Sequence, residues 1–161
     1  MPLAHSGDGK RGISAQDYAA HVNGVVSRAM KAACDAARYA ACDGELLKKT
    51  VVLAAEFHDL GKLNQENQDV LSGSRMERRL PVQHTDAGTA YLLDKLHVSS
   101  GAVLVRSHHI GLPDFVEEQN RQEESVFRDD SVIEKVNRSL PELIHLHYMA
   151  LRSVAKMSES A

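Results

Sequence analysis

The stretch TVVLAAEFHDLGK occupies residues 50–62. Its spacing of apolar residues predicts an amphipathic helix from about residue 45 to residue 60. Gly61 then stands where a glycine commonly ends a helix. The core-facing side of this helix is predicted to consist of Leu47, Val51, Ala54 and His58, which share one face at helical spacing. The pattern therefore brings a histidine, followed at once by Asp59, to the end of a core-facing helix.

Helical patterns also dominate on either side of this stretch, and no alternating strand pattern is present. We expect helices over residues 15–42, 86–97 (capped by Thr85 or Asp86) and 101–110. A short helix begins at Asp129 or Asp130, and Pro141 opens a last one that runs to about Lys156. Residues 62–83 and 114–128 are predicted as loops, and residues 1–13 as a flexible N-terminal arm. The sequence thus predicts an all-α domain, a bundle of about six helices over residues 14–161.

Composition limits the class of protein. The chain has 161 residues, 43% of them apolar, which suffices for one domain with a core and argues against disorder. Its 19 Lys+Arg and 22 Asp+Glu give a net charge of −3, which excludes a strongly basic protein that coats nucleic acid. No apolar run approaches 18 residues and no secretory signal is evident. Cys34 and Cys42, if both on one helix, lie too far apart to pair. These features indicate a cytoplasmic protein without a membrane span.

The nine histidines are the most informative feature of the composition. His21 and His58 lie on the apolar faces of two different helices, and His108 and His109 lie one turn beyond Leu104 and Val105. An imidazole that faces a core needs a partner, and several from separate helices converge most economically on a metal ion. This reasoning selects five candidate ligands, His21, His58, His84, His108 and His109, together with Asp59. We assign His5, His97, His145 and His147 to solvent or to packing.

These residues resemble the HD superfamily of metal-dependent phosphohydrolases. More narrowly, they resemble the HD nuclease domain of the CRISPR-associated helicase-nuclease of type I systems. The matching pieces are His21, FHDLGK at 57–62, QHTDAG at 83–88 and HHIGLPD at 108–114. They span about residues 15–115, and HHIGLPD after a well-spaced FHDLGK is the most specific of them.

The resemblance implies an HD-type helical bundle that binds one or two divalent transition-metal ions: manganese, nickel, cobalt, iron or zinc. By position, His21, His58 and Asp59 would hold one ion. Asp59 would bridge to a second ion held by His84, His108 and His109, and Lys62 would lie beside the site to meet a phosphate. Asp59 and Lys62 are accordingly the expected catalytic residues. The implied reaction is cleavage of single-stranded DNA by metal-activated water in CRISPR interference, an antiviral defence.

The resemblance also implies partners. A helicase domain would follow residues 14–161 in a longer protein and would deliver the strand that an RNA-guided surveillance complex has opened. Arg75, Arg78 and Arg79 form a small basic cluster before His84, for which a phosphate-guiding patch and a solvated loop are equally plausible readings. The net charge of −3 predicts weak, salt-dependent binding of nucleic acid.

One departure from the family pattern leaves the first metal site open to two interpretations. The family closes that site with an aspartate on a late helix, whereas the segment from Pro141 to Lys156 contains none. Either the chain is a piece of a longer protein, or the first site is incomplete.

Two other functions therefore stand beside the nuclease. The same metal centre can serve an HD phosphohydrolase that acts on nucleotides or cyclic dinucleotides. In the branch that acts on cyclic dinucleotides, however, the paired histidines are normally followed by a Gly-Tyr-Pro sequence, and in this chain they are followed by GLPD. A non-catalytic HD interaction module is the third possibility, motivated by the missing aspartate.

Overall fold

The computed structural model describes residues 1–111, 126, 127 and 129–159 of the chain. Helices dominate it, and the sheet in the described part has two short strands. This confirms the all-α prediction of a bundle of about six helices. The predicted loop at 114–128 and the end of the HHIGLPD motif fall mostly outside the described residues.

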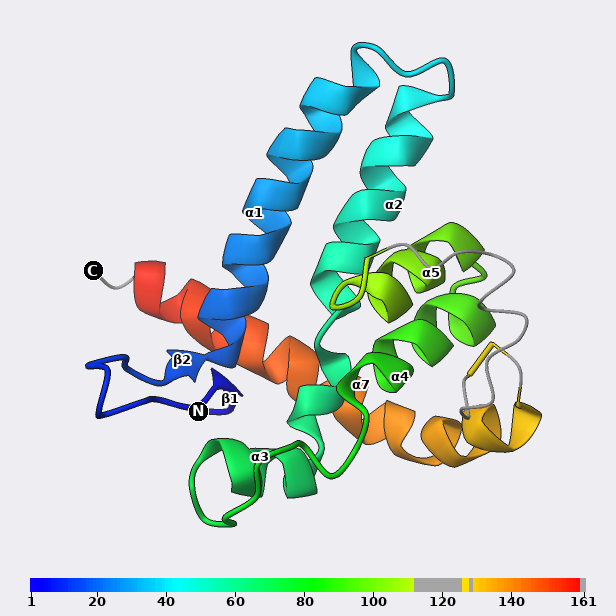
Figure 1. The fold of residues 1–161 in the computed structure, drawn as a ribbon. Helices are drawn as coiled ribbons and strands as arrows, with labels where there is room; N and C mark the ends of the chain where they lie inside the picture. Colours follow the sequence, from blue (N-terminus) through cyan, green and yellow to red (C-terminus); the bar gives the residue numbers. More distant parts are fainter. Residues whose placement is uncertain (112–125, 128, 160–161) are drawn as a thin grey trace.

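The first two long helices form an antiparallel hairpin (Figure 1). Helix α1 spans Tyr18–Ala37, and the Asp17 side chain caps it by accepting a hydrogen bond from the Ala20 N–H. Helix α2 spans Gly44–Phe57. Both helices are shorter than expected at their C-terminal ends. The chain leaves α2 at His58, so that His58 and Asp59 emerge together at the base of the hairpin.

The segment after α2 contains more regular structure than the sequence predicts. A short 3-10 helix, η1, spans Leu60–Leu63, and helix α3 spans Gln65–Leu71, capped by the Asn64 side chain. The prediction of a loop over 62–83 is therefore wrong over residues 62–71. Gly61 lies inside η1 and has no positive φ, so it does not act as a left-handed helix cap.

Two glycines allow η1 and α2 to approach the next helix, α4 (His84–Ala90), very closely. A Cβ at Gly61 would lie 2.5 Å from the His84 carbonyl oxygen, and a Cβ at Gly88 would lie 2.0 Å from the Phe57 carbonyl oxygen. Side chains larger than hydrogen do not fit at either position. Helix α4 also begins earlier than expected, so His84 is its first residue, and neither Thr85 nor Asp86 is its N-cap.

Helix α4 continues as a π-helical turn, η2 (Tyr91–Lys95), before α5 (Ser99–Ser107). Helix α5 packs against both α2 and α4. The backbone then leaves the helical geometry at Gly111, whose φ of 78° favours glycine. His108 and His109 thus stand just beyond the last turn of α5, whereas the sequence predicts a helix over 101–110 that includes both.

The N-terminal segment differs from the expected loose arm at 1–13. Strand β1 (Leu3–His5) pairs antiparallel with β2 (Gln16–Asp17). Ala4 is fully buried in the core. Gln68 of α3 accepts a hydrogen bond from the Leu3 N–H and donates one to the Leu3 carbonyl, both at 2.9 Å. A polar side chain distant in sequence thereby fixes this strand, which local patterns do not reveal.

The last helix, α7 (Asp130–Glu159), crosses the base of the bundle (Figure 1). Asp129 caps it, as expected, by accepting from the Ser131 N–H. A short helix from Asp129 or Asp130 and a separate helix that begins at Pro141 were expected, but one helix runs through this proline. The core beneath α7 includes the fully buried Tyr18, Phe57 and Leu60. No helix in the described ranges is both long and apolar enough to cross a membrane.

Candidate metal centre

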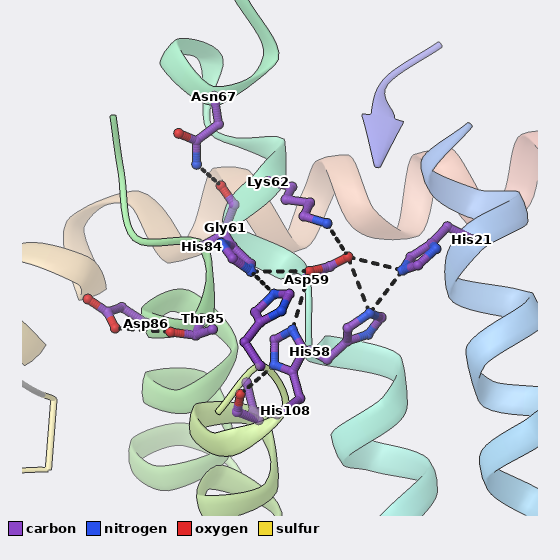
Figure 2. Close-up of polar contacts among 12 residues, drawn as sticks. His21, His58, Asp59, Gly61, Lys62, Asn67, His84, Thr85, Asp86 and His108 are labelled. Atoms are coloured by element: carbon purple, nitrogen blue, oxygen red, sulfur yellow. Dashed lines mark hydrogen bonds and ion pairs between the residues drawn. The ribbon is translucent and has the colours of Figure 1, made fainter. Parts of the chain in front are cut away.

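Asp59 lies at the middle of a cluster of histidines that come from α1, from α4 and from the residues just after α2 and α5 (Figure 2). Its side chain is 1% exposed. Oδ2 of this carboxylate lies 3.1 Å from His21 Nε2 and 3.2 Å from His58 Nε2. The two imidazole nitrogens are themselves 3.1 Å apart. The three atoms form a nearly equilateral triangle at the junction of α1 and α2.

The hydrogen bonds behind both rings determine which nitrogen faces the carboxylate. His58 Nδ1 lies 2.8 Å from the Ala55 carbonyl oxygen, and His21 Nδ1 lies 3.1 Å from Gln16 Oε1. Carbonyl and amide oxygens only accept, so each Nδ1 carries the proton. In the neutral ring the other nitrogen, Nε2, then presents a lone pair. Such support is typical of histidines that bind metals.

Three electron-pair donors that face one another repel unless a proton or a cation lies among them. Around a metal ion with bonds of about 2.1 Å, adjacent ligand atoms stand roughly 3.0–3.4 Å apart. The separations of 3.1, 3.1 and 3.2 Å in the triangle match that spacing. The first predicted ligand set, His21, His58 and Asp59, therefore fits a divalent ion without rearrangement.

A second group of donors lies on the other side of the same carboxylate. Asp59 Oδ1 is 3.6 Å from His84 Nε2 and 3.8 Å from His108 Nε2, while His84 Nε2 and His109 Nε2 are 2.8 Å apart. His108 Nδ1 donates to the Val105 carbonyl at 2.7 Å, which again leaves Nε2 free. One ligand atom from each of these four residues falls within 4.8 Å of all the others.

The second group also contains an unsatisfied polar atom. Asp59 Oδ1 is buried and accepts no hydrogen bond from any residue in the described part of the chain. A buried carboxylate oxygen without a partner is costly, so such an atom calls for an explanation. A cation between Oδ1 and the three imidazoles would satisfy it. All six predicted ligands therefore come together around the two oxygens of one carboxylate.

The protonation states suit metal binding. Burial acts to raise the pKa of Asp59, but the contacts with His21 and His58 and the charge of Lys62 outweigh it, so the pKa of this carboxyl lies well below its usual range. Burial lowers the pKa of His84 to about 4 and also lowers the pKa of His108. A charged carboxylate and neutral imidazoles are the forms that bind metal ions.

Lys62 occupies the position that the sequence predicts, beside Asp59. Its Nζ donates to Asp59 Oδ2 at 2.8 Å, and its side chain is 5% exposed. This buried amine and the buried carboxylate form a compensating ion pair at the middle of the site. Each divalent ion would then make the site positive by two units, which favours a phosphate.

The predicted basic cluster does not join this centre as a group. Arg75 forms ion pairs with Glu66 and Glu77, so its charge is compensated on the surface. Arg78 and Arg79 are exposed on the segment between α3 and α4. Of the three arginines, Arg75 is therefore paired with carboxylates, whereas Arg78 and Arg79 are exposed to solvent.

The sequence reasoning overlooks His5, which lies at the centre and not in a loose arm. Its ring packs edge-on against His21, with centroids 4.8 Å apart, and one of its nitrogens lies within 4.8 Å of donor atoms of His21 and Asp59. The other three histidines outside the predicted set behave as expected. His97 and His145 are exposed, and His147 is fully buried against Tyr18, whose hydroxyl lies 3.1 Å from its Nδ1.

A cleft adjoins the candidate centre and is lined by one histidine from each group of donors. It has a volume of about 500 Å³, and His58 and His108 stand at its edge. The remaining lining is largely apolar and comes from α1, α2 and the α5 region, including Val25, Ala54 and Leu104. The candidate centre thus opens onto a surface that can hold an uncharged part of a ligand.

Comparisons with known proteins add no identification. No family model matches the chain, and no curated protein or solved structure matches it either.

Proposed function

We propose that this chain is a metal-dependent phosphodiesterase of the HD type that cuts single-stranded DNA. The observation that carries the proposal is the position of Asp59, whose two oxygens face two separate sets of imidazole nitrogens. A carboxylate is the natural bridge between two metal ions, and two-metal centres are typical of enzymes that cleave phosphodiesters.

The residues of the centre divide into two sets of ligands. His21 and His58 would hold one ion with Asp59 Oδ2, and His84, His108 and His109 would hold a second with Asp59 Oδ1. Divalent ions at these positions would supply Lewis acidity and activate water for attack on a phosphodiester. Imidazole-rich sets of this kind favour manganese, iron, cobalt, nickel or zinc over magnesium and calcium.

Lys62 supports a phosphate ester as the substrate. Its Nζ donates to Asp59 Oδ2 and lies beside the donor atoms. From there it can contact a phosphoryl oxygen or neutralise a leaving oxygen. An ammonium is a common binder of phosphate as a compact point charge.

The apolar cleft beside His58 and His108 supports a substrate larger than a phosphate. Its volume of about 500 Å³ accommodates a sugar and base, and its lining offers little hydrogen-bonding specificity. A single-stranded nucleic acid fits such a surface, because its bases are unpaired and available. Delivery by a helicase domain and an RNA-guided complex belongs to the same proposal and rests on the motifs FHDLGK and HHIGLPD.

The test is cleavage of a circular single-stranded DNA by the purified chain with manganese or nickel. Circular DNA requires an internal cut, so exonuclease activity is not scored. We expect cleavage that stops with EDTA and falls at least about 100-fold in His58→Ala and Asp59→Asn. His145→Ala, a substitution of an exposed histidine on α7, is the matched control and should cleave like the wild type.

Two results would contradict the proposal. Unchanged cleavage in Asp59→Asn would show that the activity arises elsewhere. Hydrolysis of nucleotides or cyclic dinucleotides, with the DNA left intact, would keep the metal centre and replace the substrate.

A further inference from the structure

The first set of donors has room for a further ligand. His21, His58 and Asp59 supply three atoms, one fewer than the second set contains. Among the described side chains, none from α7 belongs to either group of donors. The adjacent element on this side of Asp59 is strand β1, which contacts both α1 and η1.

Strand β1 is held in place by contacts on both of its edges. The Tyr18 N–H donates to the Pro2 carbonyl at 2.9 Å, and Gln68 bonds to both polar backbone atoms of Leu3. Gln68 also donates to the Lys62 carbonyl at 2.7 Å. One side chain thus ties β1 to the 3-10 helix that carries Lys62. His5 is therefore positioned by the fold and does not hang from a free end.

The His5 imidazole is also available to a ligand. Its ring packs against His21 at an interplanar angle of 79°. Its side chain makes no hydrogen bond to any described residue, although its nitrogen lies within 4.8 Å of the His21 and Asp59 donor atoms. A histidine retained for packing would bury its ring, as His147 does, whereas His5 is exposed at the rim of the site.

We propose that His5 is a ligand of the ion held by His21, His58 and Asp59, an inference that rests on the metal centre proposed above. Each ion then receives three imidazole nitrogens and one oxygen of Asp59. The two sets become equivalent in chemistry: His5, His21 and His58 on one side, and His84, His108 and His109 on the other. The site needs no aspartate from a late helix, and strand β1 becomes part of the centre.

The experiment is a titration of the metal-stripped chain, free of any histidine tag, with Co²⁺. Calorimetry gives the number and affinity of the sites, and the visible absorption of Co²⁺ reports the number of ligands. The wild type should bind two ions. His5→Ala should weaken one site at least about tenfold and leave the other unchanged, because even the loss of an outer partner costs that much.

Three further variants make the result specific. His109→Ala should weaken the opposite site, and the double variant should weaken both. His145→Ala should behave like the wild type. His5→Gln keeps a polar side chain of similar reach and should fold normally by circular dichroism. The visible spectrum of Co²⁺ bound to this variant should still change, because one nitrogen ligand is lost.

The outcomes separate this inference from the proposed function. If His5→Ala binds two ions with wild-type affinity and an unchanged Co²⁺ spectrum, His5 is not a ligand, while the metal centre stands. If the wild-type chain binds no Co²⁺ at all, the metal centre and the role of His5 both fail.

Discussion

Asp59 is a charged group kept in an almost closed environment, and its neighbours explain why it stays ionised. Lys62 and two imidazoles contact Oδ2, whereas Oδ1 has no hydrogen bond within the described residues. The hydrogen bond from Lys62 thus stabilises the carboxylate on the Oδ2 side, and no described residue satisfies Oδ1. This asymmetry favours a cation on the Oδ1 side, next to His84 and His108.

The lowered pKa of His84 gives a prediction for the metal-free chain. This pKa is about 4 in the folded state, because burial disfavours the charged ring, against 6.5 for an ordinary histidine. Between these values the unfolded chain binds more protons, so the free energy of unfolding falls as the pH drops from about 6.5 to 4. For this group the loss between pH 7 and pH 5 is about 1–2 kcal/mol.

Urea unfolding in EDTA at pH 7 and pH 5 measures this effect. His84→Gln should lose less stability than the wild type over that interval, because its side chain does not titrate. His145→Ala should show the same pH dependence as the wild type. If the stability of the wild type and of His84→Gln changed equally with pH, the lowered pKa of His84 would be contradicted.

At the scale of the elements, two glycines determine how closely α4 approaches the end of α2. Gly61→Ala would push a methyl group into the backbone of His84, and Gly88→Ala would push one into the Phe57 carbonyl. We expect each to destabilise the fold by more than about 2 kcal/mol and to weaken metal binding at the second site.

Gly24→Ala in α1 is the matched control, since its nearest neighbour is the Arg28 side chain at 3.6 Å. Alanine is favoured over glycine inside a helix by about 1 kcal/mol, so this variant should be slightly more stable. Thermal unfolding of the three variants, with metal content measured alongside, tests the prediction. A Gly88→Ala chain as stable as the wild type would refute the close packing of α4 on α2.

The helices and the clustering of the candidate ligands could be predicted from the sequence, because both follow local patterns. The face that contains Val51 and His58 has helical spacing, and α2 forms where that spacing predicts. Helix α3 was not predicted, because it is short and polar and depends on Asn67, which is fully buried and bonds to the Gly61 and Val82 carbonyls. His5 was assigned to a loose arm because its strand is short and is fixed by pairing with β2 and by a contact with distant Gln68, which local patterns do not reveal.

For the whole molecule, metal binding should couple to stability, because the ligands come from elements that meet only in the folded chain. An ion that binds the native state alone adds about 2.7 kcal/mol at a free concentration of 100 Kd. We expect Mn²⁺ or Co²⁺ to raise the melting temperature of the stripped chain by several degrees.

Ca²⁺ should have a much smaller effect, since imidazole nitrogens suit it poorly. Differential scanning calorimetry at matched ionic strength measures both. In His58→Ala the shift produced by Mn²⁺ should shrink by at least half. A wild-type melting temperature that no transition metal changes would argue against a centre built from these side chains.

The α1–α2 hairpin also has a consequence for the order in which the centre is assembled. His21 and His58 are 37 residues apart and meet within a single helical hairpin. Contacts of short sequence separation form early in folding, and a chain leaves the ribosome N-terminus first. Half of the centre can therefore be complete while α4 and α5 are still being synthesised. A newly made chain in a cell would meet its first ion before its second set of ligands has been synthesised. The two positions would then be filled in the order in which their ligands are made, and not in the order of their affinities.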